Sequence, residues 1–189
     1  MIKNKKLILG SKSPRRKELL EGLGIPFTIR TKDTDESFPA STPPFDVPLF
    51  IANKKANALK EEVANDEIIL CADTVVIINN TILGKPIDEN EAITMLQLLS
   101  GKTHDVITGV VIASKDKTVM FDVTTKVTFK TLDTEEIKHY VVHYKPFDKA
   151  GAYGIQEWIG FIGVTTITGS YFNVVGLPTH EVYEALKSF

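Results

Sequence analysis

This chain of 189 residues has a single cysteine, a formal net charge of only -2 and no long hydrophobic run. One cysteine cannot form an internal disulfide bond, which excludes a disulfide-stabilised secreted scaffold. No apolar segment approaches the roughly 18 residues of a membrane-spanning helix. The small net charge argues against a protein that mainly coats nucleic acid or an anionic membrane. Any anion-binding site must therefore be local.

The start of the chain shares only its positive charge with a signal peptide. Three lysines fall within residues 1–6, but the apolar segment that follows, residues 7–9, is shorter than the roughly seven residues that a signal peptide needs. We therefore expect a cytoplasmic protein with no membrane partner. The sequence contains no internal repeat, low-complexity tract or flexible linker, and we expect one domain over residues 1–189.

Helical and strand-like patterns alternate along the chain. The predicted strands are 7–9, 25–30, 68–78, a return strand that follows a hairpin turn at Asn79-Asn80 and ends near residue 84, and two long strands within 103–130. The predicted helices begin at Ser13, near Pro48, at Asp88, near Glu135 and after Pro178. Asp88 and Glu91 form a potential capping box. This order predicts an α/β fold with five or six strands and four or five helices. We expect a mixed central sheet with flanking helices and two lobes around a cleft.

Two arginines occupy an unfavourable place in the first predicted helix. Ser13 is a suitable N-cap and Pro14 a suitable first residue, but Arg15 and Arg16 then lie at the positive end of the helix dipole. A bound anion would remove this repulsion, because free backbone N–H groups and guanidinium groups together bind phosphate well. The alternative is that both arginines extend into solvent and that Ser11 and Ser13 only cap the turn.

Asp73 interrupts an apolar strand, so its carboxylate needs a partner. That partner is either a lysine or a backbone N–H in a structural role, or a metal ion or a water molecule that Asp73 deprotonates. Both interpretations stay open from the strand alone.

Acidic and basic residues elsewhere extend the candidate site. Asp33, Asp35 and Glu36 lie in a predicted loop, where they form either a solvated acidic face or, together with Asp73, a site for Mg²⁺ or Mn²⁺. Lys55 borders the apolar stripe of its helix, whereas the adjacent lysine points away from it. Lys85 lies between a glycine and a proline. These two lysines either line a cleft or lie on the surface.

Three other motifs fail on their spacing. Residues 99–103 resemble the end of a phosphate-binding P-loop, but Leu96 stands where its first glycine is required. His139 and His143 have helical spacing but lack the glutamate of a zinc protease motif, so a hydrated helix face explains them better. No serine occupies a G-x-S-x-G turn, and serine hydrolase chemistry has no support.

Eight segments occur in an order that together is highly specific. They are Ser11-x-Ser13-Pro14-Arg15-Arg16, Asp35-Glu36, Lys55-Ala56, residues 72–76 (ADTVV), Gly84-Lys85-Pro86, residues 99–104 (LSGKTH), residues 149–156 (KAGAYGIQ) and residues 169–178 (GSYFNVVGLP). With these segments the chain resembles the Maf family of nucleoside triphosphate pyrophosphatases over essentially its whole length. The resemblance implies the mixed-sheet, two-lobed fold of inosine triphosphate pyrophosphatases.

The form of residues 151–156 is similar to the branch of that family that acts on dTTP and UTP. The resemblance implies hydrolysis of these nucleotides, and of modified pyrimidine nucleotides as a house-cleaning activity, to the monophosphate and pyrophosphate. It also implies that Asp73 is the proton acceptor and that Arg15, Thr74 and Gln156 contribute to base choice. From the acidic residues themselves we expect Mg²⁺ or Mn²⁺ as the cofactor, held by Glu36, Asp73 or both. The residues expected to bind substrate are Ser11, Ser13, Arg15, Arg16, Lys55, Thr74, Lys85 and Gln156. Glu36 and Asp73 are the expected metal ligands.

Two departures from the family pattern and two rival functions complete the expectations. Gly10 replaces the usual alanine before Ser11, and residues 157–160 (EWIG) differ from a continuation that is often richer in glycine. The first rival is a nucleotide-responsive regulator of cell division or septum formation, which would not need Asp73. The second is non-specific nucleic-acid binding, which the acidic pI of about 6.1 disfavours. A homodimer is compatible with the sequence.

Overall fold

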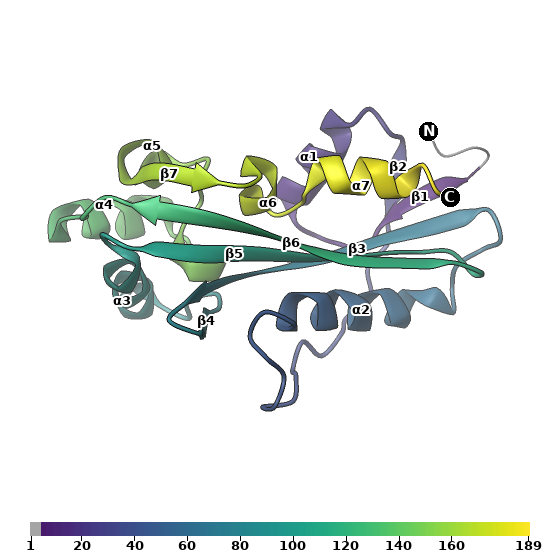
Figure 1. The fold of residues 1–189 in the computed structure, drawn as a ribbon, viewed down its shortest axis with the longest axis horizontal. Coiled ribbons are helices and arrows are strands. Elements are labelled where there is room, and N and C mark those ends of the chain that lie inside the picture. Colours follow the sequence, from purple (N-terminus) through teal and green to yellow (C-terminus); the bar gives the residue numbers. More distant parts are fainter. Residues whose placement is uncertain (1–4) are drawn as a thin grey trace. The chain divides into compact units, whose positions relative to one another are not determined.

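The computed structural model describes residues 5–189 of the chain (Figure 1). Residues 1–4, on which the signal-peptide argument partly rests, lie outside the described residues. No helix within residues 5–189 has both the length and the apolar character that a membrane span needs.

Seven strands form one sheet within the described residues. They are β1 (Lys6–Leu9), β2 (Phe27–Ile29), β3 (Glu67–Ile78), β4 (Thr81–Leu83), β5 (Thr103–Ala113), β6 (Thr118–Phe129) and β7 (Val164–Thr168). The order is β2-β1-β3-β5-β6-β7, and β4 pairs with β3 beside this path. β1 runs parallel to both β2 and β3. β4 runs antiparallel to β3, and β7 runs antiparallel to β6. The prediction of a mixed sheet is confirmed.

The described residues also form seven α-helices and one short 3-10 helix, η1. They are α1 (Pro14–Gly22), α2 (Val47–Lys60), α3 (Glu89–Leu99), α4 (Thr134–Tyr144), η1 (Ala150–Ala152), α5 (Trp158–Gly163), α6 (Tyr171–Val175) and α7 (Thr179–Leu186). The predicted numbers of strands and helices were therefore too low. Helices α5 and α6 were missed because six and five residues are too few to show a helical period.

The chain divides into two compact units, which are described separately. The first contains Met1–Asp73, Thr108–Val123 and Gly176–Phe189, and the second contains Thr74–Ile107 and Thr124–Val175. Strands β3, β5 and β6 each contribute residues to both units. The single domain expected over residues 1–189 stays a prediction.

In the first unit, helices cover both faces of the sheet, with α1 and α7 on one face and α2 on the other (Figure 1). Alternate residues of β1 separate the two cores, because successive side chains of a strand point to opposite faces. Leu9 packs in the cluster that includes Leu20 of α1 and Leu186 of α7. Ile8 packs in the cluster that includes Ala56 of α2. Residues of β3 divide between the same two clusters.

Helix α1 begins as the sequence predicts. Ser13 is its N-cap and accepts a hydrogen bond from the backbone N–H of Arg16, and Pro14 occupies its first position. No acidic residue lies in the first turn. The helix ends before Gly24, whose φ of 67° places it in the left-handed region. The unfavourable position of the two arginines is therefore real.

The second unit contains two local structures that the sequence predicted. Asn79 and Asn80 form the hairpin turn between β3 and β4, with φ values of 50° and 61°. Asp88 caps α3 and accepts a hydrogen bond of 2.8 Å from the backbone N–H of Glu91. The predicted capping box is only half formed, because the carboxylate of Glu91 accepts from the backbone N–H of Ile87 instead.

Candidate active site

A lysine that contacts two carboxylates forms the centre of the candidate site in the first unit. Lys55 Nζ lies 2.7 Å from Asp73 Oδ1 and 2.9 Å from Glu36 Oε1. Lys55 comes from α2, Asp73 from β3 and Glu36 from the loop before α2. The structure thus brings together three of the residues that the sequence predicted from distant segments.

The alternation of side chains along β3 explains why Asp73 meets Lys55. Ile69 and Cys71 point to the face of the sheet that α2 covers. Asp73 follows them with the same parity and points to the same face. On α2, Lys55 is adjacent to Ala56, which packs in the core of that face. The contact therefore results from the register of one strand and the rotation of one helix.

Asp73 and Lys55 are shielded from water, whereas Glu36 is exposed. The side chains of Asp73 and Lys55 are only 13% and 18% exposed, whereas that of Glu36 is 54% exposed. Breaking a shielded ion pair by removing one partner leaves an uncompensated charge, which is strongly destabilising. The lysine partner that the structural interpretation of Asp73 required is therefore present. Since Glu36 is exposed, the same group also remains accessible to a ligand.

The neighbouring lysine, Lys54, holds the acidic loop and was missed by the sequence analysis. Its Nζ lies 3.3 Å from Asp35 Oδ2 and 2.9 Å from the backbone oxygen of Ser37. Asp35 also accepts hydrogen bonds from the backbone N–H and the hydroxyl of Ser37, and these contacts lower the pKa of Asp35 to about 2. Adjacent lysines of α2 therefore bind the two acidic residues of the Asp35-Glu36 pair.

At the start of α1, Arg16 is held by the protein and does not extend into solvent. Its Nε donates to the backbone oxygen of Gly176 at 2.9 Å, and its Nη1 lies 3.4 Å from Ser11 Oγ. Ser11 is buried and also accepts from the backbone N–H of Ser13. Burial lowers the pKa of Arg16, and the negative charge of Asp73 opposes this shift. Arginine nevertheless stays protonated in proteins, so Arg16 is a fixed cation.

Four predicted site residues remain, and all except Arg15 belong to the second unit. Arg15, in the first unit, and Thr74 are half-buried, and Lys85 and Gln156 are exposed. Lys85 follows Gly84, whose backbone oxygen accepts a hydrogen bond of 3.0 Å from the N–H of Gly151. Within the second unit, this hydrogen bond therefore connects the segment that contains Lys85 to the glycine-containing segment that leads to Gln156.

Gly151 shows why that segment contains glycine. Its φ is 68°, and a Cβ added there would lie 2.9 Å from Val76 Cγ2. Both the backbone conformation and the close approach to β3 exclude a larger residue. The glycine in this motif is required by packing.

His104 and Tyr153 connect two of the family motifs and were also missed. His104 Nε2 lies 2.7 Å from the Tyr153 hydroxyl, and the rings of both residues pack against Phe129. His104 is only 2% exposed. Burial lowers the pKa of His104 to about 4, so its ring is neutral at physiological pH. The only sequence signal was that both residues lie in motifs of the resemblance.

The structure agrees with two of the exclusions made from spacing. Residues 99–104 form the end of α3 followed by the start of β5, whereas a P-loop requires a strand followed by a helix. His139 and His143 are exposed neighbours on α4, with ring centroids 4.3 Å apart.

The donor set is compatible with a divalent cation at Glu36 and Asp73. Their carboxylates converge on one cationic group, Lys55 Nζ, so two anionic oxygens already lie around one point. Among residues 5–189, no group of three or more histidine, cysteine or acidic side chains is arranged to hold a metal ion. Magnesium is commonly held by one or two carboxylates together with substrate phosphates, and two ligands therefore fit that ion.

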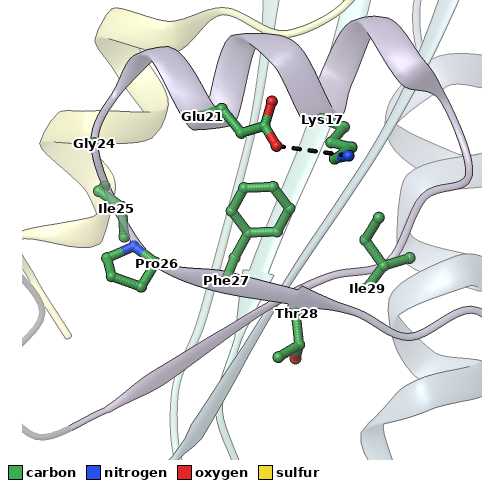
Figure 2. A pocket seen from close by; sticks show the side chains of 8 residues that line it. All are labelled: Lys17, Glu21, Gly24, Ile25, Pro26, Phe27, Thr28 and Ile29. Carbon is green, nitrogen blue, oxygen red and sulfur yellow. Dashed lines mark ion pairs between the residues drawn. The ribbon is translucent and has the colours of Figure 1, made fainter.

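A pocket of about 700 Å³ lies elsewhere in the first unit, between α1 and the edge strand β2 (Figure 2). Its cationic residue, Lys17, pairs with Glu21 at 3.6 Å. The remaining lining is mostly apolar, which does not suit a triphosphate. None of the lining residues was predicted as a site residue: Lys17, Glu21, Gly24, Ile25, Pro26, Phe27, Thr28 and Ile29.

The chain belongs to the Maf family. Residues 6–189 match the family model described as Maf-like protein. A protein of Parabacteroides distasonis named dTTP/UTP pyrophosphatase is 50% identical over 189 residues, covering 100% of this chain and 98% of that protein. A protein of Phocaeicola vulgatus with the same name is 51% identical over 183 residues, covering 96% of this chain and 95% of that protein.

One distant similarity concerns a solved structure. The Staphylococcus aureus Ham1 protein aligns with a TM-score of 0.44 and 13% identity, over 66% of this chain and 72% of that chain. The α/β class with a mixed sheet follows from the strand order itself and does not depend on this alignment.

Proposed function

We propose that this chain hydrolyses dTTP and UTP to the nucleoside monophosphate and pyrophosphate. Two relatives, 50% and 51% identical over 98% and 95% of their own lengths, carry the name of that activity. The structural observation that carries the proposal is the contact of Lys55 with both Glu36 and Asp73, in the same unit as the fixed cation Arg16. Carboxylates for proton transfer and cations for a polyphosphate are what this reaction needs.

In the proposed reaction, water attacks the α-phosphorus of the nucleotide. Asp73 accepts a proton from that water as its oxygen bonds to phosphorus. The bond between the α-phosphorus and the oxygen that bridges to the β-phosphorus breaks, and pyrophosphate leaves with the bonding electrons. Positioning and electrostatic stabilisation supply most of the acceleration in such reactions.

The polar and cationic residues bind the triphosphate in this proposal. Lys55 neutralises charge that develops next to Asp73, and Arg16 supplies a guanidinium at the positive end of the α1 dipole. Their contribution is electrostatic, since phosphoryl oxygens gain negative charge during the reaction. The complete set is Ser11, Ser13, Arg15, Arg16, Lys55 and Lys85.

The proposal assigns Mg²⁺ or Mn²⁺ to Glu36 and Asp73. When bound, such an ion supplies positive charge to the triphosphate and lowers the pKa of water. The convergence of the two carboxylates on Lys55 supports this assignment.

In this proposal, Arg15, Thr74 and Gln156 determine which nucleotide base the site accepts. When the carboxamide of Gln156 is held in one orientation, it suits thymine and uracil, because its N–H donates to the O4 oxygen that both bases carry. Cytosine presents an amino donor at that position instead. A mismatch of this kind leaves polar groups unpaired and is strongly rejected.

Product analysis tests the reaction. Incubation with dTTP and Mg²⁺ should give dTMP and pyrophosphate, whereas dTDP and inorganic phosphate would contradict attack at the α-phosphorus. At saturating Mg²⁺, Asp73→Asn should lower kcat by about 10²–10⁴-fold and retain nucleotide binding, since it removes the general base and one carboxylate ligand but leaves the cations of Arg16 and Lys55 in place. Asp66→Asn is the matched control, because Asp66 pairs with Lys6 on the surface. A regulator of cell division would keep its effect after Asp73→Asn.

Location, assembly and the substrate range belong to the same proposal. We assign the activity to the cytoplasm, without membrane or nucleic-acid partners. Size-exclusion chromatography with light scattering tests a homodimer. A panel of normal and modified pyrimidine triphosphates, assayed for pyrophosphate release, tests a house-cleaning role.

A further inference from the structure

The segment Gly154–Glu157 presents Gln156 to solvent in the second unit. Gln156 is exposed, whereas Ile155 beside it is only 8% exposed. The backbone N–H of Glu157 donates to the oxygen of Gly154 at 3.0 Å, which closes the segment into a turn. An exposed glutamine can select a base only if this turn is held in place.

A polar cluster formed by Tyr140, Lys149 and Glu157 holds both ends of the turn. The Tyr140 hydroxyl donates to Glu157 Oε2 and accepts from the backbone N–H of Gly154 at 2.9 Å. Lys149 Nζ lies 3.0 Å from the other carboxylate oxygen, Glu157 Oε1. The hydroxyl therefore connects the first residue of the turn to the side chain of the last.

The cluster is shielded enough for these contacts to matter. Tyr140 is fully buried, and the side chains of Lys149 and Glu157 are 11% and 26% exposed. Burial, and then the hydrogen bond to Glu157, raise the pKa of Tyr140 well above its ordinary value, so its hydroxyl remains a donor. Hydrogen bonds to a charged, shielded partner are among the strong ones in proteins.

Packing leaves the turn little freedom to adopt another conformation. A Cβ added at Gly154 would lie 2.8 Å from Glu157 Cδ and 3.0 Å from Lys149 Cε. The side chains of the cluster therefore fill the space next to Gly154. Glu157 is also the first residue of the segment 157–160, which the sequence analysis singled out as a departure from the resemblance.

We propose that Glu157, held by Tyr140 and Lys149, is a positioning residue that fixes Gln156 and thereby sets the selectivity for thymine and uracil over cytosine. This inference rests on the proposed function, in which Gln156 contacts the base. Glu157 itself touches neither the phosphates nor the base. It acts through the turn whose two ends it joins.

Steady-state kinetics with dTTP and dCTP test the proposal with Glu157→Gln and Tyr140→Phe. Each variant should lower the ratio of kcat/KM for dTTP to kcat/KM for dCTP by about tenfold, the loss expected for one charged hydrogen bond. The KM for dTTP should rise, while kcat changes by less than about threefold, because the groups at the phosphorus are untouched. The control variants Glu135→Gln and Tyr144→Phe, on exposed positions of the same α4, should leave the ratio unchanged.

The ratio is independent of the fraction of folded enzyme, so a merely structural role predicts lower thermal stability with an unchanged ratio. That result in both variants would overturn the proposal. If one variant does not fold, the ratio measured for the other decides. Additivity of the two substitutions in a double variant would also count against the proposal, because residues of one cluster should show coupled effects.

Fluorescence separates failure of this inference from failure of the proposed function. Trp158 is the only tryptophan of the chain and directly follows Glu157. Glu157→Gln should increase quenching of Trp158 by acrylamide without any nucleotide present, and Glu135→Gln should not. Unchanged quenching would overturn the fixation of the turn. Wild-type protein that releases no pyrophosphate from dTTP or UTP would overturn the proposed function and, with it, the selectivity assigned to Glu157.

Discussion

Lys54 and Asp35 form an ion pair at 3.3 Å directly beside the contact between Lys55 and Glu36. Two consecutive lysines of α2 thus hold two consecutive acidic residues of the preceding loop. The Lys54 pair is the more exposed, and exposed ion pairs contribute little to global stability. Its effect should therefore be local, on the position of Glu36.

Lys54→Met should lower kcat/KM for dTTP by about three- to tenfold and leave the urea midpoint of unfolding unchanged, because an exposed ion pair is worth little to the fold. Since the pKa of Asp35 is about 2, the effect should be constant between about pH 5 and pH 9. Lys60→Met, at the other end of α2, is the control. An equal loss of activity in both variants would show that general charge, and not the loop, is responsible.

Removal of divalent cations tests the assignment of Glu36 and Asp73. Activity should disappear in EDTA and return with Mg²⁺. Glu36→Gln should raise the Mg²⁺ concentration for half-maximal activity by about tenfold or more, since one of two carboxylate ligands is lost. Glu62→Gln is the control, because Glu62 pairs with Lys32 on the surface. Full activity in EDTA would contradict the metal assignment.

Gly10 lies so close to Cys71 that a side chain does not fit there. A Cβ added at Gly10 would overlap Cys71 Sγ and lie 3.0 Å from Leu59 Cδ1. Gly10→Ala should therefore lower the free energy of unfolding by about 1–3 kcal/mol, the usual cost of overpacking. Cys71→Ala should rescue it, because the sulfur atom is then gone.

Urea denaturation of both single variants and the double variant measures this coupling. Gly22→Ala is a matched control, since a Cβ added there meets no atom within 4 Å. In that helical position alanine should be neutral or stabilising. Equal destabilisation by Gly10→Ala with and without Cys71 would contradict the steric explanation.

His104 should make the stability of the protein fall in mild acid. Its pKa is about 4 in the folded protein and near 6.5 in the unfolded chain, so the unfolded chain binds more protons between these values. The contribution of neutral His104 is complete above about pH 6.5 and is lost as the pH falls toward 4. The loss is on the order of 3 kcal/mol.

Denaturation with urea from pH 7 to pH 4 measures this loss. His104→Gln should flatten the pH dependence, since an amide does not titrate in this range. His180→Gln, at an exposed position, should keep the slope of the wild type. A variant His104→Gln with an unchanged slope would assign the acid sensitivity to other groups.

Local features of the fold were predictable from the sequence because their partners lie a few residues away. Ser13 caps α1 through the N–H of Arg16, and Asn79 and Asn80 turn the β3–β4 hairpin. The same logic failed where a helix is too short to show a period, as in α5 and α6. It also overestimated the Asp88 capping box, because Glu91 had a second backbone N–H within reach.

The sequence by itself determined the order of long elements, the capped helix starts and the residue types that the reaction needs. Only the tertiary structure decided which of these residues meet. Arg16 binds the backbone oxygen of Gly176, 160 residues away, and Glu157 accepts a hydrogen bond from Tyr140, 17 residues away. Caps and turns are satisfied by nearby backbone groups, whereas a shielded charge takes the partner that the packing of distant elements brings to it.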